Sequence, residues 1–113
     1  MHQRRPENIY FVTYEAMKKD LRGEIVKMAK FLEKDLTEEQ IDTITHHCTF
    51  HSMSRNRSTN YESSSRMDFK VSKFMRKGEV GDWKNHFTIN ESIAFDKLYK
   101  GKTKHWTLKF EFE

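Results

Sequence analysis

The sequence is poor in cysteine, proline and glycine, and it lacks a long apolar run. Its 113 residues include one cysteine, Cys48, and one proline, Pro6. A single cysteine excludes an intramolecular disulfide framework and suits a reducing compartment, so we expect a cytoplasmic protein. No apolar run approaches the roughly 18 residues of a membrane span, and no apolar signal core follows residues 1–6. We therefore expect neither membrane insertion nor secretion.

Apolar residues are also scarce, whereas charged and aromatic residues are plentiful. Apolar side chains make up 35% of the sequence, below the roughly 45–50% typical of globular domains, and charged ones make up 34%. Aromatic residues nevertheless reach 13%, which argues against a wholly disordered chain. This composition fits either a small basic binding module or part of a larger domain. The net charge of +4 favours an anionic partner, such as nucleic acid, a nucleotide or an acidic surface.

One segment near the N-terminus has the pattern of a buried strand. Residues Ile9–Tyr14 are mostly β-branched or aromatic and do not alternate with polar residues. Such a run is typical of a strand covered on both faces in a parallel sheet. One strand cannot form a sheet alone, and the sequence offers no partner for it. We therefore expect the chain to be a piece of a larger α/β domain.

Two amphipathic helices are predicted next. The first begins after Asp20 as N-cap, although Gly23 weakens its first turn. The second begins after Thr37, whose spacing from Gln40 is that of a capping box. The short link at 34–36 predicts an antiparallel helical hairpin. The apolar faces are Leu21, Ile25, Met28, Ala29 and Leu32 on the first helix, and Ile41, Ile44 and a buried Cys48 on the second.

The second half of the sequence is dominated by a polar segment. Residues Ser52–Lys73 are rich in Ser, Arg and Asn, so we expect a mobile loop of about 20 residues, a length that is usually functional or disordered. A further helix is predicted over Asn90–Lys100, with Gly101 as its C-cap. The alternating residues Thr107–Glu113 predict an edge strand.

The densest candidate for chemistry is the segment Phe74–Trp83. Arg76 offers a planar fork that can grip a phosphate through two hydrogen bonds, and Lys77 adds a point charge. Gly78 lets the backbone approach an anion closely and expose its N–H groups. The spacing is neither that of a Walker A loop nor that of the dinucleotide fingerprint. On spacing alone, we favour a simpler interpretation, a solvated basic turn beside a hydrophobic anchor.

Two other clusters of residues could each form a binding site, and each also has a simpler structural explanation. His47 and His51 would share one helical face and could hold zinc, yet neither a carboxylate nor a second cysteine completes the four ligands, so we expect no metal. Basic residues around Tyr61 could bind RNA or single strands, but we favour a solvated surface loop as the explanation for them. The residues concerned are His46, His47, Cys48 and His51 in the first cluster, and Arg55, Arg57 and Arg66 in the second.

Longer motifs resemble those of the cytosolic sulfotransferases. The segment Phe74–Thr88 is similar to the signature near the C-terminus of that family. Tyr14–Lys18 resembles its Tyr-Glu-Asp-Met-Lys motif, and His46–Phe50 resembles its His-Thr-Ser-Phe motif. The resemblance covers nearly the whole chain, so residues 1–113 would be a partial, C-terminal portion of the family domain. Further similarities, in the same order, are Phe31–Glu33, Leu36–Glu39 and Asn60–Tyr61.

The resemblance implies a fold and an activity. The fold would be a P-loop-like α/β domain with a central parallel sheet. This portion would be mostly α-helical, with one buried strand near Ile9–Tyr14 and a long lid loop. The activity would be the transfer of a sulfuryl group from 3'-phosphoadenosine 5'-phosphosulfate, as co-substrate, to a hydroxyl or amine of a small acceptor. The partners would then be a nucleotide donor and a small molecule, with neither membrane nor nucleic acid involved.

The same resemblance assigns roles to residues. Arg76, Lys77 and Gly78 would hold the 3'-phosphate of the nucleotide, while Phe74 and Met75 would seat that loop. The Ser- and Arg-rich segment before Phe74 would be a lid whose closure excludes water. Tyr14 and the turn from Cys48 to Met53 would line the nucleotide pocket, with Phe50 packed on the adenine; the turn residues concerned are Cys48, Thr49, Phe50 and Met53.

Some positions depart from the family pattern. Cys48 and Thr49 replace a usual Thr and Ser, so a hydroxyl contact to adenine is lost at Cys48. The lid is slightly shorter, and Arg66 replaces a common aromatic residue, which favours a polar or anionic acceptor. A homodimer through Lys84–Ile93 would use an incomplete motif, because Ile93 occupies the position of a glutamate.

The resemblance also implies that the catalytic parts lie upstream of this sequence. The family's phosphosulfate loop and its catalytic histidine have no counterpart here, and none of the six histidines falls at the catalytic position. Sulfuryl transfer needs a base and positive charge at the bridging oxygen, so we expect this chain to be inactive alone. The alternatives are a small basic helical module that binds RNA or another polyanion, and a truncated product without stable function.

Overall fold

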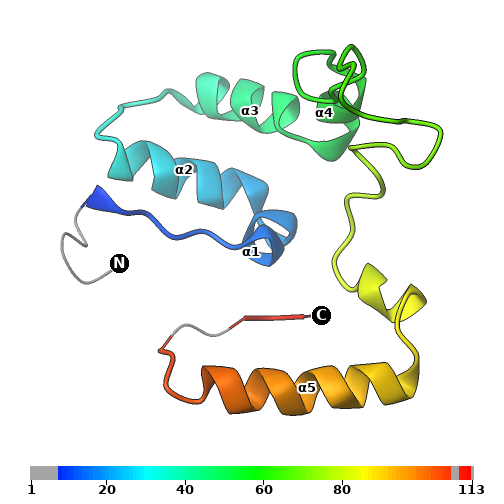
Figure 1. Ribbon diagram of the computed structural model, residues 1–113. Coiled ribbons are helices and arrows are strands. Elements are labelled where there is room, and N and C mark those ends of the chain that lie inside the picture. Colours follow the sequence, from blue (N-terminus) through cyan, green and yellow to red (C-terminus); the bar gives the residue numbers. More distant parts are fainter. Residues whose placement is uncertain (1–7, 108–109, 113) are drawn as a thin grey trace. The chain divides into compact units, whose positions relative to one another are not determined.

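The computed structural model describes residues 8–107 and 110–112. They divide into two compact units, Met1–Gly78 and Glu79–Glu113, which we describe in turn (Figure 1). Helices account for all the regular structure within the described residues, and none of these helices is long and apolar enough to cross a membrane. Residues 108, 109 and 113 of the predicted edge strand lie outside the described residues, and residues 110–112 are not in a strand.

The predicted strand at Ile9–Tyr14 is wrong for the described chain. Residues 9–13 have no strand partner, and Tyr14 instead begins helix α1 (Tyr14–Lys19), capped by the Thr13 hydroxyl. A β-strand needs a neighbour to pair with, and this chain supplies none among its described residues. The segment is held by side chains instead: Tyr10 Oη donates to Glu24 Oε2 at 2.9 Å, and its ring lies 5.4 Å from that of Phe31.

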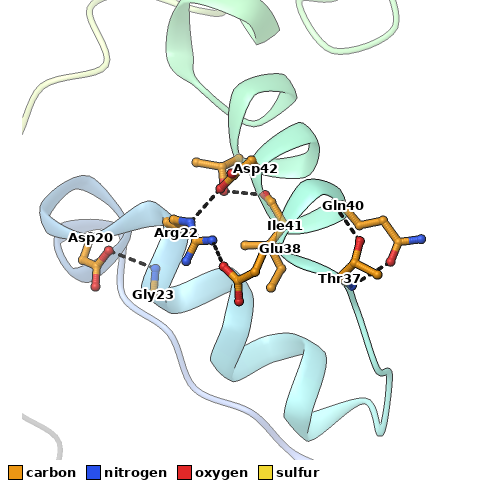
Figure 2. Close-up of polar contacts among 9 residues, drawn as sticks. Asp20, Arg22, Gly23, Thr37, Glu38, Gln40, Ile41 and Asp42 are labelled. Atoms are coloured by element: carbon orange, nitrogen blue, oxygen red, sulfur yellow. Dashed lines mark hydrogen bonds and ion pairs between the residues drawn. The ribbon is translucent and has the colours of Figure 1, made fainter.

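Helix α2 (Leu21–Phe31) begins at Asp20, as predicted. The Asp20 carboxylate accepts a hydrogen bond from the Gly23 backbone N–H at 2.9 Å (Figure 2). A β-carbon on Gly23 would lie 2.0 Å from Asp20 Oδ2. The glycine therefore leaves room for the cap, which offsets the helix propensity that it lacks.

Helix α3 (Glu38–His47) confirms both the predicted capping box and the hairpin. Thr37 and Gln40 exchange side-chain to backbone hydrogen bonds of 2.9 and 3.3 Å, and α3 lies beside α2 (Figures 1 and 2). Arg22 on α2 joins the helices through Glu38 and Asp42, with a distance of 2.7 Å to Asp42 Oδ1. The core is small: Ile25 and Ile41 are the described apolar residues that are buried, at 5% and 6% exposure.

Two expectations for the middle of the chain need correction. Cys48, the C-cap of α3, is exposed, and Ile44 one turn earlier is also 36% exposed, so of the predicted apolar face only Ile41 is buried. The polar loop also begins later than predicted, since Phe50–Arg55 forms helix α4 with Thr49 as its N-cap. Residues 56–81, all described, then contain no regular helix or strand.

The unit Glu79–Glu113 consists of a 3-10 turn, η2 (Asp82–Asn85), and helix α5 (Ile89–Thr103). The helix starts at a capping box of Thr88 and Glu91 that sequence analysis missed. Gly101 is not the predicted C-cap, because it lies within the helix and the C-cap is Lys104. The described glycines with positive φ, the conformation that favours glycine at a helix end, are Gly78 and Gly81.

Candidate functional site

The junction of α3 and α4 holds four of the predicted nucleotide-site residues. Thr49 uses its hydroxyl twice: it accepts from the Ser52 backbone N–H at 3.2 Å and donates to the His46 carbonyl at 2.9 Å. Cys48 donates its backbone N–H to the Ile44 carbonyl at 2.9 Å. Phe50 and Met53 belong to α4 and are half-buried. The expected turn from Cys48 to Met53 is therefore a helix start, with Thr49 holding the two helices together.

The segment that contains Arg76, Lys77 and Gly78 contacts this junction through Gly78. Gly78 has φ of +70°, and a β-carbon there would lie 2.2 Å from Phe50 Cδ2 and 2.4 Å from Phe50 Cγ. The ring of Phe50 therefore packs directly on the Gly78 backbone. Arg76 and Lys77, which come just before this contact, are exposed. The structure thus brings two motifs that are distant in the sequence into contact through an aromatic ring and a glycine.

A cavity of about 400 Å³ lies next to this segment, within the unit Met1–Gly78. Phe74 is anchored at it by the ring of Tyr61, 4.6 Å away at an angle of 55°. Asn60 folds back on α4, donating to the Ser54 carbonyl at 3.1 Å. Polar and aromatic side chains share the lining, which consists of Ser54, Arg55, Asn60, Glu62, Phe69, Lys73, Phe74 and Met75.

Sequence analysis missed part of this cavity and misjudged the histidine cluster. Lys73, which no motif singled out, lines the cavity together with Arg55, which sequence analysis had grouped with the basic residues around Tyr61; the loop after α4 turns back, and no local pattern in the sequence signals this. Tyr14 does not line this cavity; it begins α1 and has 45% of its surface exposed. His47 ends α3 and His51 lies in α4, so the two do not share one helical face. The described residues include no group of three or more His, Cys, Asp or Glu that could hold a metal.

This geometry is compatible with a ligand that carries both an aromatic base and a phosphate group. An aromatic ring can stack on a base, and a glycine with positive φ keeps side-chain atoms away from its own N–H. Guanidinium and ammonium groups, such as those of the neighbouring Arg76 and Lys77, can form charge-assisted hydrogen bonds with phosphate oxygens. Phe50, Gly78, Arg76 and Lys77 therefore combine the recognition chemistry of a phosphorylated nucleoside within a few residues of one contact.

Comparisons with known proteins decide the family. A model of the sulfotransferase domain matches residues 1–107. The chain belongs to the sulfotransferase family. Human Sulfotransferase 1E1 is 47% identical over 107 residues, which cover 93% of this chain and 36% of the relative. The rabbit amine sulfotransferase is 44% identical over 107 residues, covering 91% of this chain and 36% of the relative. The resemblance found in the sequence is confirmed.

Solved structures agree with this assignment. The crystal structure of retinol dehydratase in complex with androsterone and the inactive cofactor PAP matches 96% of this chain, with a TM-score of 0.85 and 32% identity. The match covers 32% of the retinol dehydratase chain. The mouse sulfotransferase SULT7A1, solved with PAP, matches 93% of this chain and 38% of its own, with a TM-score of 0.74 and 28% identity. This sulfotransferase sequence spans about a third of the length of the curated relatives it matches.

Proposed function

We propose that this chain forms the nucleotide 3'-phosphate site of a sulfotransferase. The complete enzyme would transfer a sulfuryl group from 3'-phosphoadenosine 5'-phosphosulfate to a hydroxyl or amine of a small acceptor. The observation that carries the proposal is the contact between Phe50 and Gly78, since it joins an aromatic ring to the segment that bears Arg76 and Lys77. The PAP bound in both solved relatives supports a nucleotide of this kind.

The proposed roles follow from the chemistry of each group. Phe50 would pack against the adenine, and the Arg76 fork with Lys77 and the Gly78 N–H would bind the 3'-phosphate. Because the Thr49 hydroxyl already donates to His46, it would offer the nucleotide its remaining oxygen lone pair. The other lining residues of this proposed site are Tyr14, Cys48, Met53, Phe74 and Met75.

We further infer that residues 1–113 form one partial domain that does not transfer sulfuryl groups alone. A base and a phosphosulfate loop would come from the rest of the domain, because none of the six histidines matches the family's catalytic one. The Ser- and Arg-rich segment before Phe74 would act as the lid, and the enzyme would work in the cytoplasm. A homodimer through Lys84–Ile93 stays a prediction.

The proposal is tested by calorimetric titration of the chain with adenosine 3',5'-bisphosphate. We expect saturable 1:1 binding that Arg76→Ala weakens at least about tenfold, because hydrogen bonds to charged groups contribute about 1.5–3 kcal/mol. Arg57→Ala is the matched control, since it removes the same side chain from an exposed turn of the loop. Its affinity should equal that of the unchanged chain.

Two results would contradict the proposal. One is the absence of saturable binding to the bisphosphate. The other is equal weakening by Arg76→Ala and Arg57→Ala, together with tight, strongly salt-dependent binding to a single-stranded RNA oligonucleotide. That second pattern is the signature of charge spread over many phosphate contacts and would favour the polyanion-binding module.

A further inference from the structure

Two aromatic contacts hold the basic segment, residues 74–78, at both of its ends. At the start of the segment, the ring of Phe74 lies 4.6 Å from that of Tyr61, at an angle of 55°. At its end, a β-carbon on Gly78 would lie 2.2 Å from the ring of Phe50, so that ring packs on the backbone. Both contacts lie within the first unit of the chain. The basic segment is therefore fixed on either side of its two charged residues.

Both contacts lead back to helix α4. Phe50 is the first residue of this helix. Just beyond the other end of α4, Thr59 Oγ1 donates to the Met53 carbonyl at 2.6 Å. Asn60 Nδ2 donates to the Ser54 carbonyl at 3.1 Å. The last carbonyls of a helix lack partners within the helix, so these side chains bind them and tie the turn that precedes Tyr61 to α4.

The backbone of Tyr61 has a conformation that a tyrosine rarely adopts. Its φ is +58°, in the left-handed region, which costs free energy and persists only where the surrounding structure imposes it. Hydrogen bonds flank the residue on both sides. The Glu62 N–H donates to Asn60 Oδ1 at 2.9 Å, and the Ser64 N–H donates to the Tyr61 carbonyl at 2.8 Å. The chain therefore turns sharply at Tyr61 and directs its ring to Phe74.

We propose that Tyr61 is a positioning residue, whose ring holds the basic segment in place for a phosphate through its contact with Phe74. A segment that is fixed at both ends loses less conformational entropy when Arg76 and Lys77 bind phosphate oxygens. Tyr61 acts through Phe74 and needs no contact with the ligand. The proposal rests on the proposed nucleotide site, to which it adds a residue outside the predicted contacts.

The first test measures the basic segment without a ligand. NMR order parameters of the amides of residues 75–77 should be near 0.85 in the unchanged chain, the value typical of a rigid backbone, and should fall below about 0.6 in Tyr61→Asn. Asparagine tolerates the left-handed conformation, so this variant tests the ring and not the backbone. Tyr61→Phe keeps the ring and should keep the order. Val71→Asn changes the same loop away from the cavity and should also keep it.

The second test measures the affinity for adenosine 3',5'-bisphosphate by calorimetry. Tyr61→Asn should weaken binding about threefold to tenfold, the size of an aromatic pair's contribution, whereas Tyr61→Phe and Val71→Asn should leave it unchanged. Phe74→Leu should weaken binding less in Tyr61→Asn than in the unchanged chain, because either substitution breaks the same contact. A purely additive loss would show that the two rings act separately.

Three results would overturn the proposal. They are equal order parameters in the unchanged chain and Tyr61→Asn, a loss of order or affinity in Tyr61→Phe, and an equal effect of Val71→Asn. A different result would overturn the nucleotide site itself, namely that the unchanged chain does not bind the bisphosphate. In that case the order parameters would still decide whether the ring of Tyr61 holds the basic segment.

Discussion

The ring of Phe50, at the start of α4, packs on the backbone of Gly78, at the end of the Arg76-Lys77 segment. Gly78 has φ of +70°, and a β-carbon at this residue would lie within 2.2–2.8 Å of three ring atoms of Phe50. Both the dihedral angle and the space therefore require glycine. The contact fixes where the basic segment runs relative to α4.

Gly78→Ala should therefore destabilise the unit Met1–Gly78 and weaken nucleotide binding together. The left-handed conformation alone costs a residue with a β-carbon about 1–2 kcal/mol, and the clash with a ring adds to that cost. We expect a lower midpoint in urea unfolding followed by circular dichroism. Calorimetry should show at least about tenfold weaker binding of adenosine 3',5'-bisphosphate.

Two other glycines provide graded controls for this substitution. Gly81 also has positive φ, at +81°, but its nearest atom to a new β-carbon would be 3.9 Å away, so Gly81→Ala should carry the dihedral cost without a clash. Gly101 lies inside α5 with open space around it, and Gly101→Ala should stabilise that helix by about 0.5–1 kcal/mol. Equal behaviour of all three variants would refute the role assigned to Gly78.

The helices could be predicted from the sequence because their signals are local. Asp20 and Thr37 both cap the helices expected of them, and the capping box of Thr37 and Gln40 forms as its spacing indicates. These contacts join residues three apart, so the sequence alone contains both partners. The missed capping box of Thr88 and Glu91 has the same spacing and was available by the same reasoning.

The errors concern features that depend on distant residues. The segment Ile9–Tyr14 has strand composition, but a strand also requires a neighbour that this chain does not supply among its described residues. Cys48 fits the apolar spacing of α3, yet burial also needs a distant segment to cover that face, and both Cys48 and Ile44 are exposed. The contact of Phe50 with Gly78 could not be derived from spacing. The family motif indicated both residues as parts of one site, but their packing came from the structure.

The small core makes a second prediction possible. Ile41 is 6% exposed between α2 and α3, whereas Ile44, on the same helix, is 36% exposed. Ile41→Val should lower the free energy of unfolding by about 0.5–1.5 kcal/mol, since removal of a buried methyl group leaves a void. Ile44→Val makes the same chemical change at a partly exposed position. Its unfolding curve should nearly coincide with that of the unchanged chain, and equal losses would show that the hairpin core lies elsewhere.

The buried Glu24 predicts a pH dependence. Lys27 Nζ lies 2.7 Å from Glu24 Oε1, and this hydrogen bond, followed by the one from Tyr10, holds the pKa of Glu24 below its ordinary value. A lowered pKa in the folded state contributes stability that is present above the ordinary pKa of glutamate. This stability is lost as the pH falls through the lowered value. Urea unfolding at a series of acidic pH values should show this loss, and Glu24→Gln should remove it.

Tyr10→Phe separates the two contributions to this pH dependence. It deletes the hydroxyl that donates to Glu24 but keeps the ring beside Phe31, so part of the acid-dependent loss should remain through Lys27. Tyr14→Phe removes the same hydroxyl from an exposed ring in α1 and should leave the pH profile unchanged. A profile in Glu24→Gln identical to that of the unchanged chain would exclude Glu24 as the source.

The capping box at the start of α5 gives a last prediction. Thr88 Oγ1 accepts from the Glu91 backbone N–H at 3.3 Å, and a Glu91 carboxylate oxygen accepts from the Thr88 backbone N–H at 2.8 Å. Thr88→Ala should lower the stability of α5 by about 1 kcal/mol, seen as lost helical circular dichroism, whereas Thr88→Ser should retain the cap.

Acid should loosen the same helix end, because the hydrogen bonds from the Thr88 backbone and hydroxyl hold the pKa of Glu91 below its ordinary value. Their stabilisation is present above the ordinary glutamate pKa and disappears as the pH falls through the lowered one. Glu91→Gln should therefore keep the α5 signal constant across that pH range. If Thr88→Ala and Thr88→Ser lose equal helicity, tertiary contacts and not the cap determine where α5 begins.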